Sequence, residues 1–293
     1  MKVKICPECR QAFTTTAAGL ELLYAHLMHE HRLPAEAAGD ATDEAKIAQI
    51  LQKTADYCRR LEGALLDFVC VEEVKETLYY EVFEKEYNFG SYRVIDRDEE
   101  HTFLYEYQLI RNAEKTEESR TLIEKDGRKR CEKVAGVGTL RFRFENIIYG
   151  PVDLLNRAHQ PYFKYALVGE ESNPEGKTVI IEAVPDPSET EYCPFGKIWV
   201  RESDFAILKI EYNQLSIKTL YAENQDHKRE KGESQFELTS EFGVEKNGIR
   251  FPSRLVFQEV KVDRSGTKDV RSRAEITYRD YRFFTVTVDV DYK

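Results

Sequence analysis

Residues 236–242 read FELTSEF, a stretch in which apolar and polar side chains alternate. Its even-numbered positions carry Phe236, Leu238 and Phe242, whereas its odd-numbered positions carry charged or hydroxyl side chains. A period of two is typical of an antiparallel strand that turns one face to a core and the other to solvent. The stretch therefore decides in favour of a β-rich fold.

The same alternation recurs along the chain after residue 68. The residues that share a face in these segments are Leu140, Phe142 and Phe144; Val256, Val260 and Val262; and Phe284, Val286, Val288 and Val290. Turn signals separate such segments at Asp126-Gly127, Asn173-Pro174, Asn247-Gly248 and Ser265-Gly266. We predict a mainly β (α+β) fold, a large curved antiparallel sheet or half-barrel of about ten strands.

Two helices are predicted in addition to these strands, one before them and one among them. Residues 43–68 predict a long amphipathic helix, with Thr42 as its N-cap and two acidic residues in its first turn. Its apolar stripe consists of Ile47, Leu51, Thr54, Cys58, Leu61, Leu65 and Phe68. Residues 150–158 predict a short helix that starts at Pro151. A half-closed sheet with these helices has an apolar concavity, which either its own helices or a ligand can fill.

The N-terminal residues 1–33 have the layout of a Cys2His2 zinc finger. Cys6 and Cys9 form a C-x2-C pair, and His26 and His31 follow with an H-x4-H spacing. We expect these four residues to bind one Zn2+, which would stabilise a segment too short to fold on its own apolar core. His29 is the alternative fourth ligand, since it lies on the same helix face as His26. Incidental Cys and His residues on a helical hairpin are the plain alternative.

Composition limits the partners of the protein. The 293 residues carry a formal net charge of −10, and an acidic body repels nucleic acid and anionic membrane surfaces. No stretch is apolar enough for a membrane helix, and no signal peptide is evident, so we expect a cytoplasmic protein. Residues 34–43 are small and polar and predict a linker between a module of residues 1–33 and a domain of residues 44–293.

The sequence contains no signature of catalysis. His101, His159 and His227 are isolated in polar segments, and the scattered Cys58, Cys70, Cys131 and Cys193 are expected to be small buried residues. The single tryptophan, Trp199, is expected to pack in the core. We therefore predict a protein that is not an enzyme. A hydrolase whose Cys or Ser meets a His only in the folded chain is the remaining catalytic alternative.

Residues 44–293 resemble the superfamily of the periplasmic outer-membrane lipoprotein carrier, the lipoprotein-sorting proteins. The resemblance rests on the small helix near Pro151 and on the segments DFVCVEE (67–73), GKIWVRESDFAILKIEY (196–212), NGIRFPSRLVF (247–257) and EITYRDYRFFTV (275–286). It implies an eleven-stranded half-barrel over a helix lid. It also implies a periplasmic location as the alternative, and binding of an acyl chain, a lipoprotein or another apolar ligand without chemistry.

The sequence thus predicts a binding protein with a zinc module and a half-barrel for an apolar ligand or lipoprotein-like partner. The sequence does not identify which residues would line the concavity. The alternative is an intracellular adaptor or regulatory protein, in which the finger binds a protein or nucleic acid and the barrel is a filled scaffold. Nucleic acid is the less favoured partner, because residues 1–33 carry almost no net charge.

Overall fold

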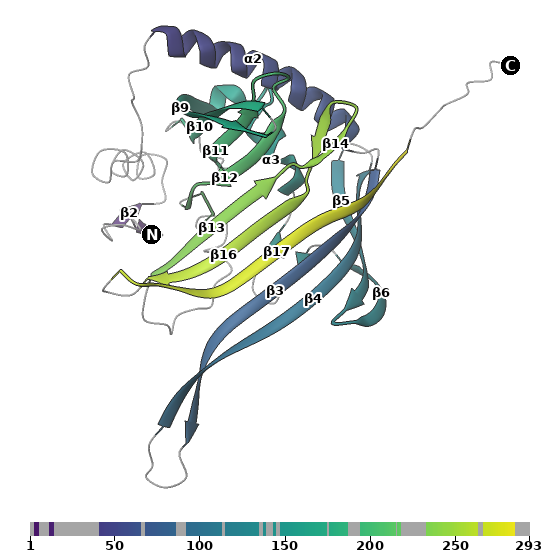
Figure 1. Cartoon of the computed structure of the whole chain (residues 1–293), viewed down its shortest axis with the longest axis vertical. Helices are drawn as coiled ribbons and strands as arrows, with labels where there is room; N and C mark the ends of the chain where they lie inside the picture. The colour runs from purple at the N-terminus through teal and green to yellow at the C-terminus, as the bar shows by residue number, and fades with distance from the viewer. Residues whose placement is uncertain are drawn as a thin grey trace, which may run out of the picture.

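One large antiparallel sheet organises the molecule. The computed structural model describes residues 3–5, 12–14, 41–65, 68–85, 92–112, 115–134, 137–138, 143–144, 147–174, 176–186, 194–214, 216–217, 233–262 and 266–284. Eleven strands pair in the order β6-β5-β4-β3-β17-β16-β13-β12-β11-β10-β9. Figure 1 shows that this sheet is strongly curved and that helix α2 crosses one end of it.

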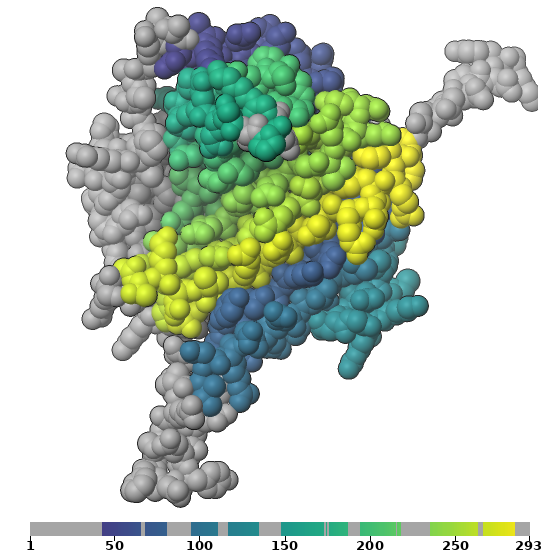
Figure 2. Space-filling view, in the orientation of Figure 1, coloured from purple at the N-terminus to yellow at the C-terminus, as the bar shows by residue number. Residues whose placement is uncertain are grey.

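The strands of this sheet are β3 (Phe68–Lys85), β4 (Tyr92–Asn112), β5 (Lys115–Lys125), β6 (Arg128–Val134), β9 (Phe163–Asn173), β10 (Gly176–Pro185), β11 (Gly196–Arg201), β12 (Ile207–Tyr212), β13 (Glu233–Glu241), β16 (Arg254–Val262) and β17 (Lys268–Phe283). Smaller hairpins are β1 (Val3–Ile5) with β2 (Ala12–Thr14), β7 (Val137–Gly138) with β8 (Arg143–Phe144), and β14 (Val244–Lys246) with β15 (Ile249–Phe251). Within the described residues, the structure has the helices α2 (Ala41–Ala64) and α3 (Gly150–Leu155), 3-10 turns at Ile147–Tyr149 and Gln160–Tyr162, and helical residues at 214, 216 and 217. On the face seen in Figure 2, β13, β16, β17 and β3 follow one another as adjacent bands.

The predicted mainly β fold is confirmed, and so is the strand that contains FELTSEF. β13 ends at Glu241, and Phe236 and Leu238 are buried on its core side. In the neighbouring strand β16, Val256, Val260 and Val262 share a face as predicted, and it is the face opposite to that of the core residues Leu255 and Phe257. Residues 285–293, and with them Val286, Val288 and Val290, lie outside the described residues, as do Leu140 and Phe142.

Two of the predicted turns reverse the chain through left-handed backbone. Asp126 and Gly127 have φ of 48° and 74°, and Asn247 and Gly248 have φ of 53° and 69°. Positive φ at both central residues is the geometry of a type I′ turn, whose twist matches that of the strands it joins. These pairs connect β5 to β6 and β14 to β15.

Helix α2 confirms the predicted amphipathic helix but not its ends. The helix begins at Ala41, so Thr42 lies within its first turn and is not its N-cap. At the other end, Phe68 is the first residue of β3 and not the last of the helical stripe. From Phe68 the apolar positions repeat every second residue, and Phe68, Cys70 and Val74 are fully buried. A period of two is typical of an extended chain and agrees with the start of β3 at this point.

Helix α3 confirms the predicted short helix, with Pro151 in its first turn. It packs beneath α2, where the Cys58 Sγ lies 3.2 Å from the Pro151 carbonyl oxygen. Gly150 is required there, because a Cβ at this position would lie 2.1 Å from the Tyr212 Oη. Asp153 is half-buried by this packing, and burial raises its pKa to about 6, an effect that His159 opposes and Glu62 reinforces.

We expect Asp153 to destabilise the protein at neutral pH. The unfolded chain ionises Asp153 near its ordinary pKa of 3.8, before the folded protein does. The free energy of unfolding should therefore fall as pH rises from 4 to 6, by up to about 3 kcal/mol from this group, and level off above. Asp153→Asn should remove that loss and be more stable than the native protein at pH 7.5 but not at pH 4.

Urea denaturation at the two pH values measures this difference. Asp56→Asn, an exposed substitution on helix α2, is the matched control and should change stability little at either pH. An Asp153→Asn variant whose stability relative to the native protein is the same at pH 4 and pH 7.5 would contradict the prediction.

The hairpin of β3 and β4 is longer than the sheet that holds it. β17 pairs with β3 only up to Leu78, and β5 pairs with β4 only from Phe103. Residues 79–85 therefore pair only with residues 92–98 among the described strands. Figure 1 shows this part as a two-stranded ribbon that extends beyond the other strands.

Candidate functional site: the inner face of the sheet

The inner face of the sheet, defined as the face that shares one core with α2 and α3, is apolar over most of its width. One row of core-facing residues crosses six neighbouring strands from β12 to β4. Its members are Ile210, Ser240, Leu255, Ile276, Val74 and Phe103. All of them are at most 5% exposed, so this row is shielded from water. This row is suited to hold apolar groups, and its only polar group is the Ser240 hydroxyl.

A second row runs beside the first and carries charge at one end. Tyr212, Leu238, Phe257 and Ala274 continue across to Glu76 and His101. Ala274 is fully buried and has the smallest side chain of either row. Of these two rows, the inner face therefore carries its smallest side chain on β17, near its middle.

A buried ion network lies farther along the inner face, across β3, β4 and β5. Arg120 Nε and Nη2 donate to the two carboxylate oxygens of Glu72, at 2.7 and 3.2 Å. Arg120 Nη1 donates to Glu118 at 2.8 Å, and the Tyr107 hydroxyl donates to the same carboxylate at 3.0 Å. Glu72 and Arg120 are 0% and 2% exposed.

The surroundings of this network favour the charged guanidinium. Burial raises the pKa of Glu72, and the two hydrogen bonds from Arg120 oppose that rise. The pKa of Arg120 is raised, because two carboxylates outweigh its loss of hydration. Its Cζ lies 4.7 Å from the centroid of the Tyr107 ring, a cation–π contact that further favours the positive charge.

Sequence reasoning missed this network, although one signal was present. The core-facing positions of β3 run Phe68, Cys70, Glu72 and Val74, so a carboxylate stands where the pattern calls for an apolar residue. A charge on the buried face of an alternating segment points to a buried partner. The sequence could not show that this partner is Arg120, because their contact depends on the order of β3, β4 and β5 in the sheet.

Helix α2 covers one end of the inner face, and its two halves are held differently. Near its N-terminus, Lys46 forms ion pairs with Glu170 and Glu202, whose side chains are 41% and 30% exposed. Toward its C-terminus, Tyr57, Cys58, Leu61 and Leu65 are at most 1% exposed, and the Tyr57 hydroxyl accepts the Arg250 backbone N–H at 2.8 Å. Burial raises the pKa of Tyr57 to about 12, so its hydroxyl stays neutral.

The predicted zinc ligands Cys6, Cys9, His26 and His31 lie outside the described residues, as does His29, so the zinc site stays a prediction. The strands β1 and β2 pair antiparallel, with Lys4 opposite Phe13. In the part of the chain that the structure describes, no group of three or more His, Cys, Asp or Glu residues could hold a metal ion.

The other candidates from the sequence have ordinary partners. His101 contacts Glu99 and Asp126 at 2.9 and 3.4 Å, and His159 contacts the Val152 carbonyl oxygen at 3.3 Å. Cys58 and Cys70 are buried as expected, and burial raises the pKa of both, which keeps them as unreactive thiols. Cys131 is exposed, contrary to expectation, because it lies on the charged edge strand β6. His227 and Cys193 lie outside the described residues.

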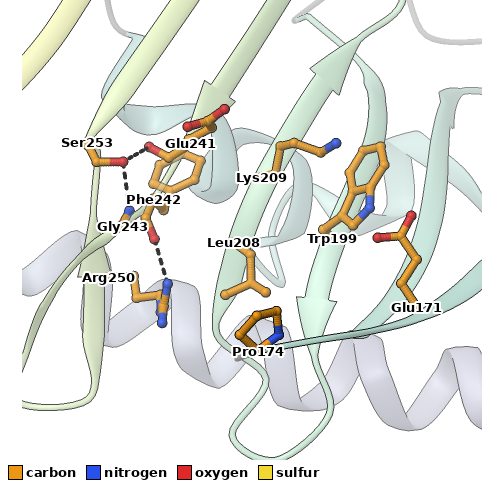
Figure 3. A pocket seen from close by; sticks show the side chains of 10 residues that line it. All are labelled: Glu171, Pro174, Trp199, Leu208, Lys209, Glu241, Phe242, Gly243, Arg250 and Ser253. Atoms are coloured by element: carbon orange, nitrogen blue, oxygen red, sulfur yellow. Dashed lines mark hydrogen bonds between the residues drawn. The ribbon is translucent and has the colours of Figure 1, made fainter. Parts of the chain in front are cut away.

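Trp199 is also placed differently from the prediction. It is 8% exposed, but it alternates with the core residues Ile198 and Val200 and therefore lies on the outer face of the sheet. There it lines a cavity of about 450 Å³, which Figure 3 shows from close by. No helix in the described residues is long and apolar enough to cross a membrane.

Comparisons with known proteins give only distant structural similarity. No family model and no curated protein matches the sequence. A LolA superfamily protein from Nitrosomonas europaea is 13% identical, with 82% of this chain and 94% of that chain covered and a TM-score of 0.34. A lipoprotein-sorting protein domain from Vibrio parahaemolyticus is 12% identical, with 82% and 95% covered and a TM-score of 0.33.

A DUF1329 family protein from Desulfovibrio piger is 14% identical, with 80% of this chain and 92% of that chain covered and a TM-score of 0.32. The first two are from the group of proteins that residues 44–293 resemble in sequence pattern. At these TM-scores the similarities say nothing about what this chain binds.

Proposed function

We propose that this protein is a non-enzymatic binding protein that holds an apolar ligand, of the acyl-chain class, between the inner face of its sheet and helix α2. The observation that carries the proposal is the apolar row across six strands, which shares one core with α2 and α3. Acyl chains need apolar contact area and few polar partners, and this face supplies both. A lipoprotein would present the same acyl chemistry and fits the same face.

Helix α2 is suited to act as a lid over such a ligand. Its C-terminal half is fixed by buried side chains, whereas its N-terminal half is joined through Lys46 to exposed carboxylates. Exposed ion pairs stabilise weakly and are screened by salt. The turns of α2 that precede Ile50, a core residue only 4% exposed, can therefore leave the sheet at a low free-energy cost, while the rest of the helix stays in place as a hinge.

Binding of a fluorescent acyl probe tests the proposal. We expect 11-(dansylamino)undecanoic acid to bind the delipidated protein saturably and to be displaced by palmitate. Ala274→Phe should weaken binding at least tenfold, because a ring would occupy the space beside the smallest side chain of the inner face. Thr277→Phe is the matched control, since Thr277 lies on the outer face of the same strand.

Three outcomes would contradict the proposal. These are absence of saturable binding, equal effects of the two substitutions in variants that keep the native melting temperature, and failure of palmitate to compete with the probe.

We also propose that residues 1–33 bind one Zn2+ through Cys6, Cys9, His26 and His31. The antiparallel pairing of β1 with β2 supports this, because residues 6–11, which include both cysteines, connect two paired strands. A thiolate pair in the turn between two strands is the arrangement that Cys2His2 modules use. A zinc-bearing module could also contact a protein partner.

Native mass spectrometry of the full-length protein, purified without chelator, should show the mass of one zinc ion. The zinc should be lost in Cys9→Ser and retained in Cys131→Ser, whose thiol is exposed on β6. A metal-free native protein, or zinc that persists in Cys9→Ser, would contradict the assignment.

A further inference from the structure

The cavity beside Trp199 has the size and lining of a ligand site. It lies on the outer face, between the turn that joins β9 to β10 and the segment that joins β13 to β14, and measures about 450 Å³. Volumes of about 300–1,000 Å³ are usual for ligand pockets. Pro174, Leu208 and Phe242 contribute apolar surface to it (Figure 3). The cavity is on the side of the sheet opposite the acyl site proposed above, so the failure of one proposal would not affect the other.

Trp199 carries a buried, unused hydrogen-bond donor in the wall of this cavity. Its side chain is 92% buried, and its Nε1–H has no hydrogen-bond partner in the part of the chain that the structure describes. The Lys209 ammonium lies 3.6 Å from the centroid of the indole ring and covers one face. Lys209 is itself held by Glu211 at 2.7 Å. A buried N–H without a partner is unfavourable, so a ligand that supplies an acceptor for it would gain binding free energy.

The acidic and basic residues that line the cavity itself are equal in number. Glu171 and Glu241 line it together with Lys209 and Arg250, two carboxylates against two cations. Arg250 is directed at the protein, since its Nη1 donates to the Phe242 carbonyl oxygen at 3.1 Å. A cavity of this kind attracts neither anions nor cations strongly at long range, but it offers donors and acceptors around an apolar floor.

A ligand that matches these features is neutral, carries alternating carbonyl and N–H groups, and has an apolar side chain. We propose that the cavity binds a short extended peptide segment. A peptide carbonyl would accept from Trp199 Nε1, and an aliphatic side chain would rest on Leu208 and Pro174. Glu171 and Glu241 would accept peptide N–H groups at the rim.

The emission of Trp199, the only tryptophan in the chain, reports directly on this cavity. The probe is the blocked peptide Ac-Ala-Leu-Ala-NH2, with Ac-Ala-Glu-Ala-NH2 and Ac-Ala-Lys-Ala-NH2 as comparisons. We expect a saturable emission change with the leucine peptide, and at least fivefold weaker binding of both charged peptides. The indole N–H proton resonance should move downfield on saturation, as for a newly formed hydrogen bond.

Leu208→Ala should weaken binding of the leucine peptide at least fivefold. Val168→Ala is the control, because Val168 is 43% exposed on β9 and does not line the cavity. Equal binding of the three peptides, or no saturable change in emission, would overturn the proposal and does not depend on any variant. An upfield shift of the indole N–H resonance in ligand-free Glu171→Ala would also overturn it, since Glu171 would then already be the acceptor.

Discussion

Replacing Arg120 with methionine is expected to lower the free energy of unfolding by about 3–5 kcal/mol. The substitution keeps a similar volume but removes the only cation that contacts Glu72 and Glu118 in the described structure. Both carboxylates would then be buried and unbalanced, and each would have to take up a proton or draw in water. Urea denaturation at pH 7.5, followed by far-UV circular dichroism, measures the loss.

A double substitution separates the ion pair from simple packing. Arg120→Met combined with Glu72→Gln should be more stable than Arg120→Met alone, because the second change removes a charge that has lost its partner. Arg279→Met is the surface control: Arg279 pairs with Glu73 at 3.3 Å and is 45% exposed, so its loss should cost well under about 1 kcal/mol. Equal destabilisation by Arg120→Met and Arg279→Met would refute this account of the network.

Phe68→Ala is expected to destabilise the protein by a comparable amount, about 3–5 kcal/mol. Phe68 is fully buried where α2 gives way to β3. Its ring centroid lies 4.9 Å from that of Tyr281 and 5.4 Å from that of Phe251, so one side chain joins β3, β17 and β15. Truncation would leave a cavity, and the rings of Tyr281 and Phe251 could fill it only if the backbone of their strands moved.

Thermal and urea denaturation of Phe68→Ala should show a lower midpoint with an unchanged urea m-value. Phe284→Ala is the matched control, because Phe284 is 49% exposed just past the end of β17 and should matter by less than about 0.5 kcal/mol. If Phe68→Ala were as stable as Phe284→Ala, the aromatic cluster around Phe68 would not be a centre of stability.

Local chemistry explains which parts of the fold could be predicted from sequence. The alternation around Phe236 and the Asn247-Gly248 turn depend on neighbours in the chain, and both were predicted correctly. The faces of Val256 and Trp199 depend on neighbouring strands. On the strand of Val256, the pairing with β17 shifts register between Glu259 and Val260. On the strand of Trp199, the pairing with β12 shifts register between Trp199 and Val200.

The candidate site was predicted in kind but not in detail. An apolar inner face with helices was expected. The buried position of Arg120 and the small side chain of Ala274 beside Phe257 and Glu76 could be placed only once the order of the strands was known. Phe68 shows the same limit at a boundary: its spacing fits both the stripe of α2 and the alternation of β3, and only packing against Phe251 and Tyr281 distinguishes the two.

The ribbon of residues 79–85 and 92–98 divides the molecule into regions of unequal protection. A two-stranded hairpin in water is marginally stable by itself, so its ladder can open without disturbing the body of the sheet. Amide hydrogens there should exchange with deuterium through such local openings, whereas those of 68–78 should exchange only when the whole sheet unfolds. One continuous strand, β3, would thus record two separate free energies along its length.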